Sequence, residues 1–377
     1  MRVLMTGGGT GGHVYPALAI AELIKTNLPH AEIAFVGTER GIEHKLVPAA
    51  GYRLYPIRIQ GIRRSLSLSN LKTAYYVMTS PAKAKKIIRE FKPDIVIGTG
   101  GYVCWPLLKA AAAMGIPTMV HESNALPGMA VKQLQKKIDV ILTNFEETKA
   151  LLTAQEKVVN VGNPLRNACG TIDRAEARAR LGIPDSIRFV ILSFGGSLGA
   201  PALNRAALDL MEGFSCRHED VMQIHASGAT HYETVRAEFE QRGLQSCERT
   251  VLRDYIHDMP LYMAAADLVI CRAGAMTLTE LARMGKPAIL IPSPHVTDNH
   301  QYKNAKVLYD AGAAELIEEA KLDAESVCAA VADIYADGER RYEMSRNIRR
   351  FGRDDAGRRI YEEIQFLLHR KQVIVEK

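Results

Sequence analysis

The sequence predicts an α/β fold with two successive parallel-sheet domains facing a cleft, and three observations lead to this prediction. At 377 residues the chain is too long for one ordinary hydrophobic core. Short apolar runs of strand length alternate with longer helical patterns. This alternation starts twice, at residues 2–5 and 188–193, and a glycine-rich loop follows each start.

The first glycine loop covers residues 6–13, Thr-Gly-Gly-Gly-Thr-Gly-Gly-His, and leads into a helix predicted over residues 17–26. Backbone amides without a neighbouring Cβ, next to a helix N-terminus, favour an anion. The spacing Gly-x-Gly-x-x-Gly also fits the dinucleotide fingerprint. That fingerprint needs an acidic residue at the end of the second strand, and this strand ends in Gly37-Thr38 instead. We therefore disfavour a nicotinamide or flavin cofactor.

The remaining elements continue the alternation. Further strands are predicted at residues 94–97, 117–121, 140–143, 158–161, 221–225, 250–252, 268–271 and 288–291. Residues 162–166, Gly-Asn-Pro-Leu-Arg, interrupt the pattern and are predicted to link the domains. The second glycine loop covers residues 195–200, and after about residue 320 the chain is helical and highly charged. Glycine and polar residues gather after the strands, where ligands of parallel sheets bind.

Two polar segments in the second half are candidates for ligand binding. In residues 271–280 a helix is predicted to begin after Gly274. Its first backbone amides, with Thr277 and Thr279, would then bind a diphosphate. Glu280 would then accept hydrogen bonds from a ribose diol, or it is an ordinary surface glutamate near a helix start. Residues 292–301 are rich in side chains that bond sugar hydroxyls, although a Pro-rich turn with a helix cap gives the same pattern.

Composition limits the function classes. Apolar residues make up 47% and charged residues 24%, as in soluble globular proteins, and the net charge of +6 is too modest to indicate nucleic-acid binding. The six cysteines form no C-x-x-C pair, which predicts reduced cytoplasmic thiols rather than disulfides or a metal site. No secretory signal precedes the first strand, and the apolar stretch at residues 110–120 is too short to cross a bilayer.

Seven motifs occur in the order seen in one known family: GGGTGGHVYPA (residues 7–17), GTGGYV (98–103), HESN (121–124), GNPLR (162–166), GGSLGA (195–200), CRAGAMTLTE (271–280) and PSPHVTDNHQY (292–302). With these motifs the chain, from about residue 2 to 365, resembles the MurG family. Its members move N-acetylglucosamine from UDP-N-acetylglucosamine to the 4-hydroxyl of the N-acetylmuramyl unit of lipid I, giving lipid II for peptidoglycan and hence for cell shape and division.

The resemblance implies a GT-B fold of two Rossmann-like domains and inverting chemistry without metal or cofactor. The absence of an Asp-x-Asp motif after a strand agrees with the metal-free expectation. We expect an N-terminal domain on the acceptor and membrane side at residues 1–163 and a UDP-sugar domain at residues 164–353. Residues 354–377 are expected to form a helix that packs back on the N-terminal domain.

The resemblance also assigns residues to the donor. Ser197 would hold phosphate, the backbone of Ile256 would meet uracil, and Gln301 would bind the sugar hydroxyls. The helix start at Ala275, Met276 and Thr277, with Glu280 on the ribose, would continue the site. Thr10, Gly11, Gly12, Asn124 and Arg166 would complete it, with a hinge role as the alternative for Arg166.

An inverting displacement needs one base for the attacking hydroxyl. His13 is the favoured candidate, because it closes the first glycine loop and an unperturbed histidine titrates near pH ~6.5. His121 and Glu122, at the end of another strand, are its rivals.

Three positions depart from the family pattern. Ser123 stands where glutamine is usual, Ala273 where serine is frequent, and Trp105 where a small residue is common. Because Trp105 follows the loop of Tyr102, a predicted acceptor residue, the shape of the acceptor pocket is the feature most affected.

Residues 62–92 carry eight cations and a single acid, Glu90. Within this stretch Leu68, Leu71, Tyr75 and Met78 recur at helical spacing, near the lysines Lys83, Lys85 and Lys86. This pattern predicts a surface that lies on anionic lipid, at the cytoplasmic face of the cell membrane and without a spanning helix. The alternative is a stripe that packs into the core, with the lysines solvated.

The expected partners are UDP-N-acetylglucosamine, lipid I, the anionic membrane and other cell-wall synthesis proteins. Two other functions remain open. A UDP-N-acetylglucosamine 2-epimerase would share the architecture but act on a soluble sugar. A non-catalytic nucleotide-sugar-binding subunit would need a separate catalytic partner, which is disfavoured because both glycine loops and the linker lie in one chain.

Overall fold

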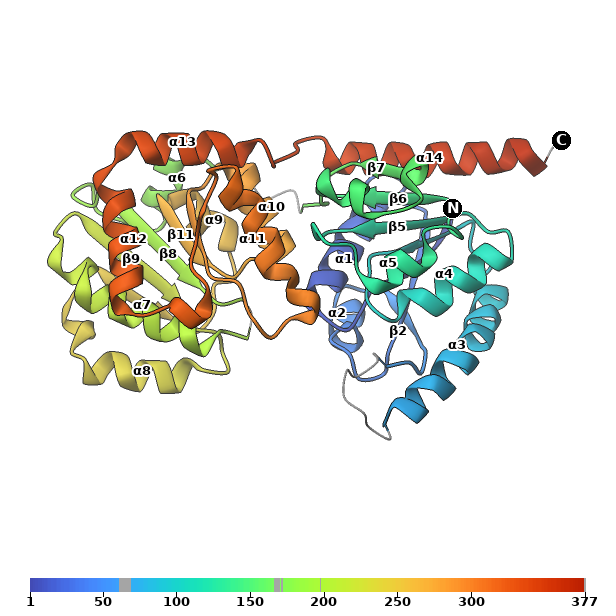
Figure 1. Ribbon diagram of the computed structural model, residues 1–377, viewed down its shortest axis with the longest axis horizontal. Coiled ribbons are helices and arrows are strands. Elements are labelled where there is room, and N and C mark those ends of the chain that lie inside the picture. Colours follow the sequence, from blue (N-terminus) through green and yellow to red (C-terminus); the bar gives the residue numbers. More distant parts are fainter. Residues whose placement is uncertain (61–68, 166–169, 171, 197, 376–377) are drawn as a thin grey trace. The chain divides into compact units, whose positions relative to one another are not determined.

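The computed structural model describes residues 1–375 except 61–68, 166–169, 171 and 197 (Figure 1). The chain forms two compact units. The first unit contains Met1–Leu165 together with Arg353–Lys377, and the second contains Arg166–Gly352. Each unit is built on its own parallel sheet, so the α/β class and the two-sheet architecture predicted from the sequence are confirmed.

The described residues of the first unit form a seven-stranded sheet in the order β3-β2-β1-β4-β5-β6-β7. The strands are β1 (Arg2–Thr6), β2 (Glu32–Gly37), β3 (Arg53–Pro56), β4 (Ile95–Gly98), β5 (Thr118–Glu122), β6 (Val140–Thr143) and β7 (Val158–Asn160). Because β2 and β4 both pair with β1 in parallel, the strand order reverses between β1 and β4. Such a reversal leaves space at the carboxyl ends of the two strands, where α/β sheets bind ligands.

Helices cover both faces of this sheet. They are α1 (Gly11–Asn27), α2 (Glu43–Ala49), α3 (Ser69–Phe91), α4 (Cys104–Ala113), α5 (Met129–Leu134) and α14 (Ala356–Val375), with the 3₁₀ turns η1 (Glu147–Leu151) and η2 (Gln155–Lys157). One hydrophobic cluster joins α3, α4 and α5 to the sheet. The other joins α1 and α14, whose Ile360, Ile364 and Leu367 are fully buried. Their spacing of four and three residues places these three side chains on one helix face. Figure 1 shows α14 beside the sheet of the first unit.

In the second unit the described residues form a six-stranded sheet in the order β10-β9-β8-β11-β12-β13. The strands are β8 (Phe189–Phe194), β9 (Val221–Ala226), β10 (Thr250–Arg253), β11 (Leu268–Cys271), β12 (Ala288–Leu290) and β13 (Glu315–Leu316). The helices are α6 (Arg174–Arg180), α7 (Pro201–Gly213), α8 (Tyr232–Gln241), α9 (Met259–Ala265), α10 (Ala275–Met284), α11 (His300–Asp310), α12 (Ala324–Ala336) and α13 (Gly338–Arg349). Here the strand order reverses between β8 and β11, the second place where a ligand is expected.

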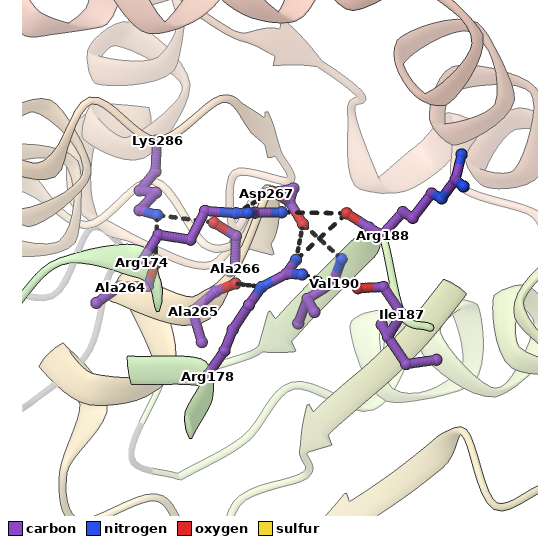
Figure 2. Close-up of polar contacts among 10 residues, drawn as sticks. All are labelled: Arg174, Arg178, Ile187, Arg188, Val190, Ala264, Ala265, Ala266, Asp267 and Lys286. Atoms are coloured by element: carbon purple, nitrogen blue, oxygen red, sulfur yellow. Dashed lines mark hydrogen bonds and ion pairs between the residues drawn. The ribbon is translucent and has the colours of Figure 1, made fainter. Parts of the chain in front are cut away.

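A cluster of charged side chains ties α6 to the amino ends of β8 and β11 (Figure 2). Asp267 accepts hydrogen bonds from Arg174 Nε at 2.8 Å, from Arg178 at 2.5 Å and from the Val190 amide at 2.7 Å. Lys286 lies nearby and donates to two backbone carbonyls that end α9. Burial lowers the pKa of Lys286 to about 8. The Asp267 carboxylate therefore links α6 and β8 to the start of β11.

Candidate functional site

Two glycine loops lie side by side at the strand reversal of the first unit. Gly101 has φ +83°, and a Cβ added there would lie 2.2 Å from the carbonyl oxygen of Gly8. Thr99 Oγ1 donates a hydrogen bond of 2.6 Å to the His13 carbonyl. The loop after β1 and the loop after β4 are thus in backbone contact, which is why the second loop needs glycine.

The loop after β4 also orients the side chain of His13, in the first turn of α1. His13 Nδ1 lies 3.1 Å from the carbonyl oxygen of Thr99. Because a carbonyl only accepts, this contact assigns the ring proton to Nδ1, and Nε2 carries the lone pair of the neutral ring. A Cβ added to Gly100 would lie 2.6 Å from Nδ1, so glycine allows this close approach. His13 is half-buried, and Thr10 and Gly12 beside it are exposed, with Gly11 half-buried.

Glu43 is a residue of this region that the sequence analysis missed. It begins α2, is fully buried and accepts hydrogen bonds from the Gly9 amide at 3.1 Å and from the Thr38 amide at 3.0 Å. Thr38 Oγ1 donates a third bond of 2.6 Å. Burial raises the pKa of Glu43, but these hydrogen bonds outweigh it, and the pKa lies below its usual value. Three glycines make room for this side chain, because a Cβ added to Gly8 or Gly41 would collide with its carboxylate and one added to Gly37 with its Cγ.

Tyr102 and Trp105 follow the loop after β4. The Tyr102 ring packs on Gly9, since a Cβ added there would lie 2.9 Å from Tyr102 Cε1. Burial and the nearby Glu43 carboxylate raise the pKa of Tyr102. Trp105, the departure noted in the sequence, packs against the hydrophobic cluster, and Lys109 Nζ lies 4.3 Å from the centre of its ring. The large side chain is therefore accommodated by packing within the first unit.

His121 and Glu122, the rival bases, are both buried at the end of β5. His121 Nε2 donates to the Gly162 carbonyl at 2.8 Å, and burial lowers the pKa of His121 to about 4. Glu122 accepts bonds from the Asn124 amide at 3.0 Å, from the Asn124 side chain at 3.1 Å and from the Gly128 amide at 2.8 Å. Burial raises the pKa of Glu122 in spite of these bonds. Glu122 thus orients Asn124, whereas His121 ties the end of β5 to the backbone of Gly162.

The buried histidines predict acid sensitivity. Burial lowers the pKa of His121 and of His225, one in each unit, to about 4, whereas an unfolded histidine titrates near ~6.5. Between these values the unfolded chain binds more protons, so the free energy of unfolding falls as pH falls. We expect each unit to lose about 3 kcal/mol between pH 7 and 4 from its histidine. Urea unfolding at several pH values measures this, and replacing the exposed His30 with glutamine should leave the slope unchanged.

In the second unit, helix α10 begins at the strand reversal. Gly274 is its N-cap, Ala275 is buried, and Met276 and Thr277 are half-buried at its first turn. Glu280 is half-buried one turn further along. Burial and the charge of Glu280 both raise the pKa of Cys271, which places that carboxylate near the end of β11. Thr279, expected to face a diphosphate, is buried instead, and its hydroxyl donates to the Ala275 carbonyl at 2.9 Å.

The loop after β12 is the second polar segment of this unit. Gln301 is half-buried, and its Oε1 accepts a bond of 2.9 Å from the Ser293 amide. Asn299 is the N-cap of α11, with φ +52°. Ile256 follows β10 and is buried. A missed residue, Arg272, donates to the Ile291 carbonyl at 3.0 Å and pairs with Glu319, so it ties the loops of this unit together.

Four of the predicted residues fall wholly or partly outside the described part of the chain. Arg166, Ser197 and Leu68 lie outside the described residues, and so does the side chain of Leu71. Within the described ranges, no three His, Cys, Asp or Glu side chains gather to hold a metal ion. Of the helices that the structure describes, none is both long and apolar enough to cross a bilayer.

Helix α3 carries the predicted membrane surface. Tyr75 is 63% exposed and Met78 is 79% exposed, so for these two the alternative of core packing is wrong. Among the described side chains of α3, Ile87, Ile88 and Phe91 are buried in the hydrophobic cluster of the first unit. Lys83, Lys85 and Lys86 are exposed.

Comparison with known proteins gives consistent matches over the chain. Residues 3–143 match the glycosyltransferase family 28 N-terminal domain, and residues 190–360 match its C-terminal domain. A UDP-N-acetylglucosamine–N-acetylmuramyl-(pentapeptide) pyrophosphoryl-undecaprenol N-acetylglucosamine transferase of Acetivibrio thermocellus is 41% identical over 374 residues, covering 98% of this chain and 99% of the relative.

Solved structures agree with these matches. The crystal structure of Acinetobacter baumannii MurG has a TM-score of 0.77 and 28% identity, covering 97% of this chain and 99% of that chain. A UDP-GlcNAc 2-epimerase from Neisseria meningitidis, bound to UDP-GlcNAc, has a TM-score of 0.65 and 15% identity, with 97% and 100% covered. At that identity the likeness shows the fold alone.

Proposed function

The chain belongs to the MurG family within glycosyltransferase family 28, and from this premise we propose which residues carry its reaction. It is a hexosyltransferase that moves N-acetylglucosamine from UDP-N-acetylglucosamine to the 4-hydroxyl of the N-acetylmuramyl unit of lipid I. The product is lipid II, used for peptidoglycan synthesis. The sequence match over nearly the whole chain carries this conclusion.

His13 is the proposed general base. Inversion requires that one group remove the proton of the attacking hydroxyl during a single displacement. The hydrogen bond of Nδ1 to the Thr99 carbonyl supports the role, because the neutral ring then has its lone pair on Nε2. The rivals are less suitable, since His121 and Glu122 are buried and already bonded to backbone groups.

The donor is proposed to bind mainly through the second unit. The N-terminal amides of α10, at Ala275, Met276 and Thr277, and Ser197 with its loop would stabilise the charge that develops on the leaving UDP. Glu280 would bind the ribose, Gln301 the sugar hydroxyls and the Ile256 backbone the uracil. In the first unit we propose Thr10, Gly11, Gly12 and Asn124, and in the linker Arg166, as further donor contacts. Tyr102 is the proposed acceptor residue.

Replacing Glu280 with alanine tests the ribose contact. The donor KM should rise more than the acceptor KM, because a hydrogen bond to a charged group contributes about 1.5–3 kcal/mol. Glu325→Ala is the control, since Glu325 lies in the first turn of α12 and is exposed. Unchanged UDP-N-acetylglucosamine binding in calorimetry would contradict the assignment.

The two alternative functions, a 2-epimerase and a non-catalytic nucleotide-sugar-binding subunit, predict different chemistry. A 2-epimerase would convert UDP-N-acetylglucosamine without any acceptor, and a non-catalytic subunit would bind it without turnover. Incubating the protein with labelled UDP-N-acetylglucosamine, with and without lipid I, separates all three. We expect label in lipid II only when lipid I is present.

Turnover is expected to be equal with and without EDTA, because the reaction is proposed to need no metal. Recovery of EDTA-inhibited turnover by Mg²⁺ would overturn the metal-free mechanism.

We further propose that α3 binds the cytoplasmic face of the membrane. The acceptor carries a polyprenyl chain held in the bilayer, so the enzyme must reach that surface. The exposed Tyr75 and Met78 beside the exposed Lys83, Lys85 and Lys86 support this, because apolar side chains near clustered cations favour anionic lipid.

Changing Lys83, Lys85 and Lys86 to glutamate should weaken sedimentation with anionic vesicles. Each basic residue near the surface contributes on the order of 1 kcal/mol, screened by salt. Turnover of a detergent-solubilised, short-chain acceptor should stay nearly unchanged. The same replacement of Lys136, Lys137 and Lys149, which are exposed elsewhere in the first unit, changes the net charge equally and serves as the control. If both variants bind vesicles like the parent, α3 is not the membrane surface.

A further inference from the structure

A chain of buried polar groups lies beneath the turn that follows β8. Ser193 in β8, His225 in β9, Asn204 in α7 and Ser227 after β9 are all buried. Ser193 Oγ lies 2.9 Å from His225 Nδ1, and His225 Nε2 lies 3.1 Å from Asn204 Oδ1. Asn204 Nδ2 donates a bond of 3.0 Å to the Ser227 carbonyl. These four groups connect the centre of the sheet to the loop after β9.

The directions of these hydrogen bonds follow from the bond between Asn204 and Ser227. Asn204 uses its amide nitrogen on the Ser227 carbonyl, so its Oδ1 is the atom that accepts from His225. His225 therefore donates from Nε2, and its Nδ1 accepts from the Ser193 hydroxyl, although the Ser193 carbonyl oxygen, which only accepts, also lies 3.1 Å from Nδ1. Burial lowers the pKa of His225 to about 4, in agreement with a neutral ring. The four buried groups are thus uncharged at physiological pH.

The far end of the chain supports the glycine turn after β8. A Cβ added to Gly199 would lie only 2.0 Å from the Ser227 carbonyl oxygen, the same atom that Asn204 holds. Gly199 and Gly228 have φ of +79° and +83°, and a Cβ added to Gly228 would lie 2.3 Å from the Gly199 amide nitrogen. The two turns pack backbone against backbone, so the position of the Ser227 carbonyl determines the position of Gly199.

We propose that His225 is a positioning residue for the donor diphosphate, acting through Asn204 and Ser227. This role rests on the proposed function, in which the turn after β8 binds the donor phosphates. Amides that stabilise a developing charge must be held in place before the reaction. The hydrogen bond from His225 fixes the rotamer of Asn204, Asn204 fixes the Ser227 carbonyl, and that carbonyl limits where the turn can lie.

The same strand provides a matched control. Gln223 lies two residues before His225, so its side chain points to the same face of β9, and it is equally buried. Gln223 Nε2 donates to the Ala207 carbonyl of α7 at 2.9 Å, and Gln223 Oε1 accepts from Ser215 at 2.7 Å. Gln223 is thus a buried polar link to α7 that lies further from the turns after β8 and β9 than His225 does.

The test replaces His225 by each of two residues with an amide side chain, glutamine and asparagine. In His225→Gln the amide nitrogen reaches the place of Nε2 and keeps the bond to Asn204, whereas His225→Asn reaches only the place of Nδ1. We expect His225→Asn to raise the donor KM about five- to tenfold, the loss expected for one buried hydrogen bond, with kcat within twofold. His225→Gln should restore the parent donor KM. Asn204→Ser, which breaks the link to Ser227, should behave like His225→Asn.

Gln223→Leu should lower the thermal unfolding temperature without raising the donor KM. An equal rise in donor KM for Gln223→Leu, or an unchanged KM for both His225→Asn and Asn204→Ser, would overturn the positioning role and leave the proposed function standing. A parent protein that does not bind UDP-N-acetylglucosamine in calorimetry would overturn the proposed function and the positioning role with it.

Discussion

Replacing His13 with alanine is expected to lower kcat by roughly 10²–10⁴-fold, the effect of removing a general base. The hydroxyl of the acceptor would then have to lose its proton to water. UDP affinity should stay near that of the parent, because the imidazole is proposed to act on the acceptor and not on the nucleotide. Steady-state kinetics with lipid I and calorimetry with UDP measure the two quantities.

The controls for this experiment come from the same unit. His30→Ala removes an exposed histidine from the first unit and should leave kcat unchanged. The pH profile gives a second reading, because loss of the base should also remove the acidic limb of kcat. If His13→Ala retains turnover within a few-fold of the parent, His13 is not the base, and Glu122→Gln becomes the variant to measure.

The largest effect on stability is expected for Asp267→Ala. Asp267 accepts bonds from Arg174, Arg178 and the Val190 amide, and Lys286 lies in the same cluster. Without the carboxylate, the largely buried guanidinium of Arg178 keeps its charge but loses its counter-ion. Breaking a buried pair from one side costs about 3–5 kcal/mol, and partial exposure of Arg174 places the expected loss near 3 kcal/mol. Urea unfolding of the second unit measures it.

Three further variants separate the causes. Asp333→Ala removes an acid that is 71% exposed and should change the free energy of unfolding by less than about 0.5 kcal/mol. Asp267→Asn keeps an acceptor for the Val190 amide, so its loss of stability measures the contribution of the negative charge alone. Adding Arg178→Leu to Asp267→Ala should recover part of the loss, because it removes the unpaired charge. A double variant no more stable than Asp267→Ala would contradict this explanation.

The sequence predicts well what depends on local patterns. Buried strands such as Phe189–Phe194, apolar except for Ser193, and Leu268–Cys271 stand out in the sequence, so both sheets and their glycine loops could be found. The edge strand Arg53–Pro56 was not predicted, because it is short, begins with arginine and ends with proline. The two-residue strand Glu315–Leu316 has too little sequence to form a pattern.

Contacts between distant residues explain most of what was missed in the site. Glu43 binds Gly9, 34 residues away, and Arg272 pairs with Glu319, 47 residues away. Nothing in the local sequence distinguishes these residues from surface charges. The burial of His121 and Glu122 also depends on the packing around β5 and could not be read from the HESN motif. Helical spacing alone left open whether Tyr75 and Met78 face lipid or pack into the core. Their exposure in the structure excludes core packing for these two side chains.

The helix α14 has a consequence for biosynthesis. Its Ile360, Ile364 and Leu367 belong to the core of the first unit, although the whole second unit, Arg166–Gly352, is translated before them. The part of the apolar face that α14 covers therefore stays exposed until almost the entire chain has been made. During this interval the nascent first unit is expected to depend on chaperones more than the second unit, whose core residues all lie in one continuous segment.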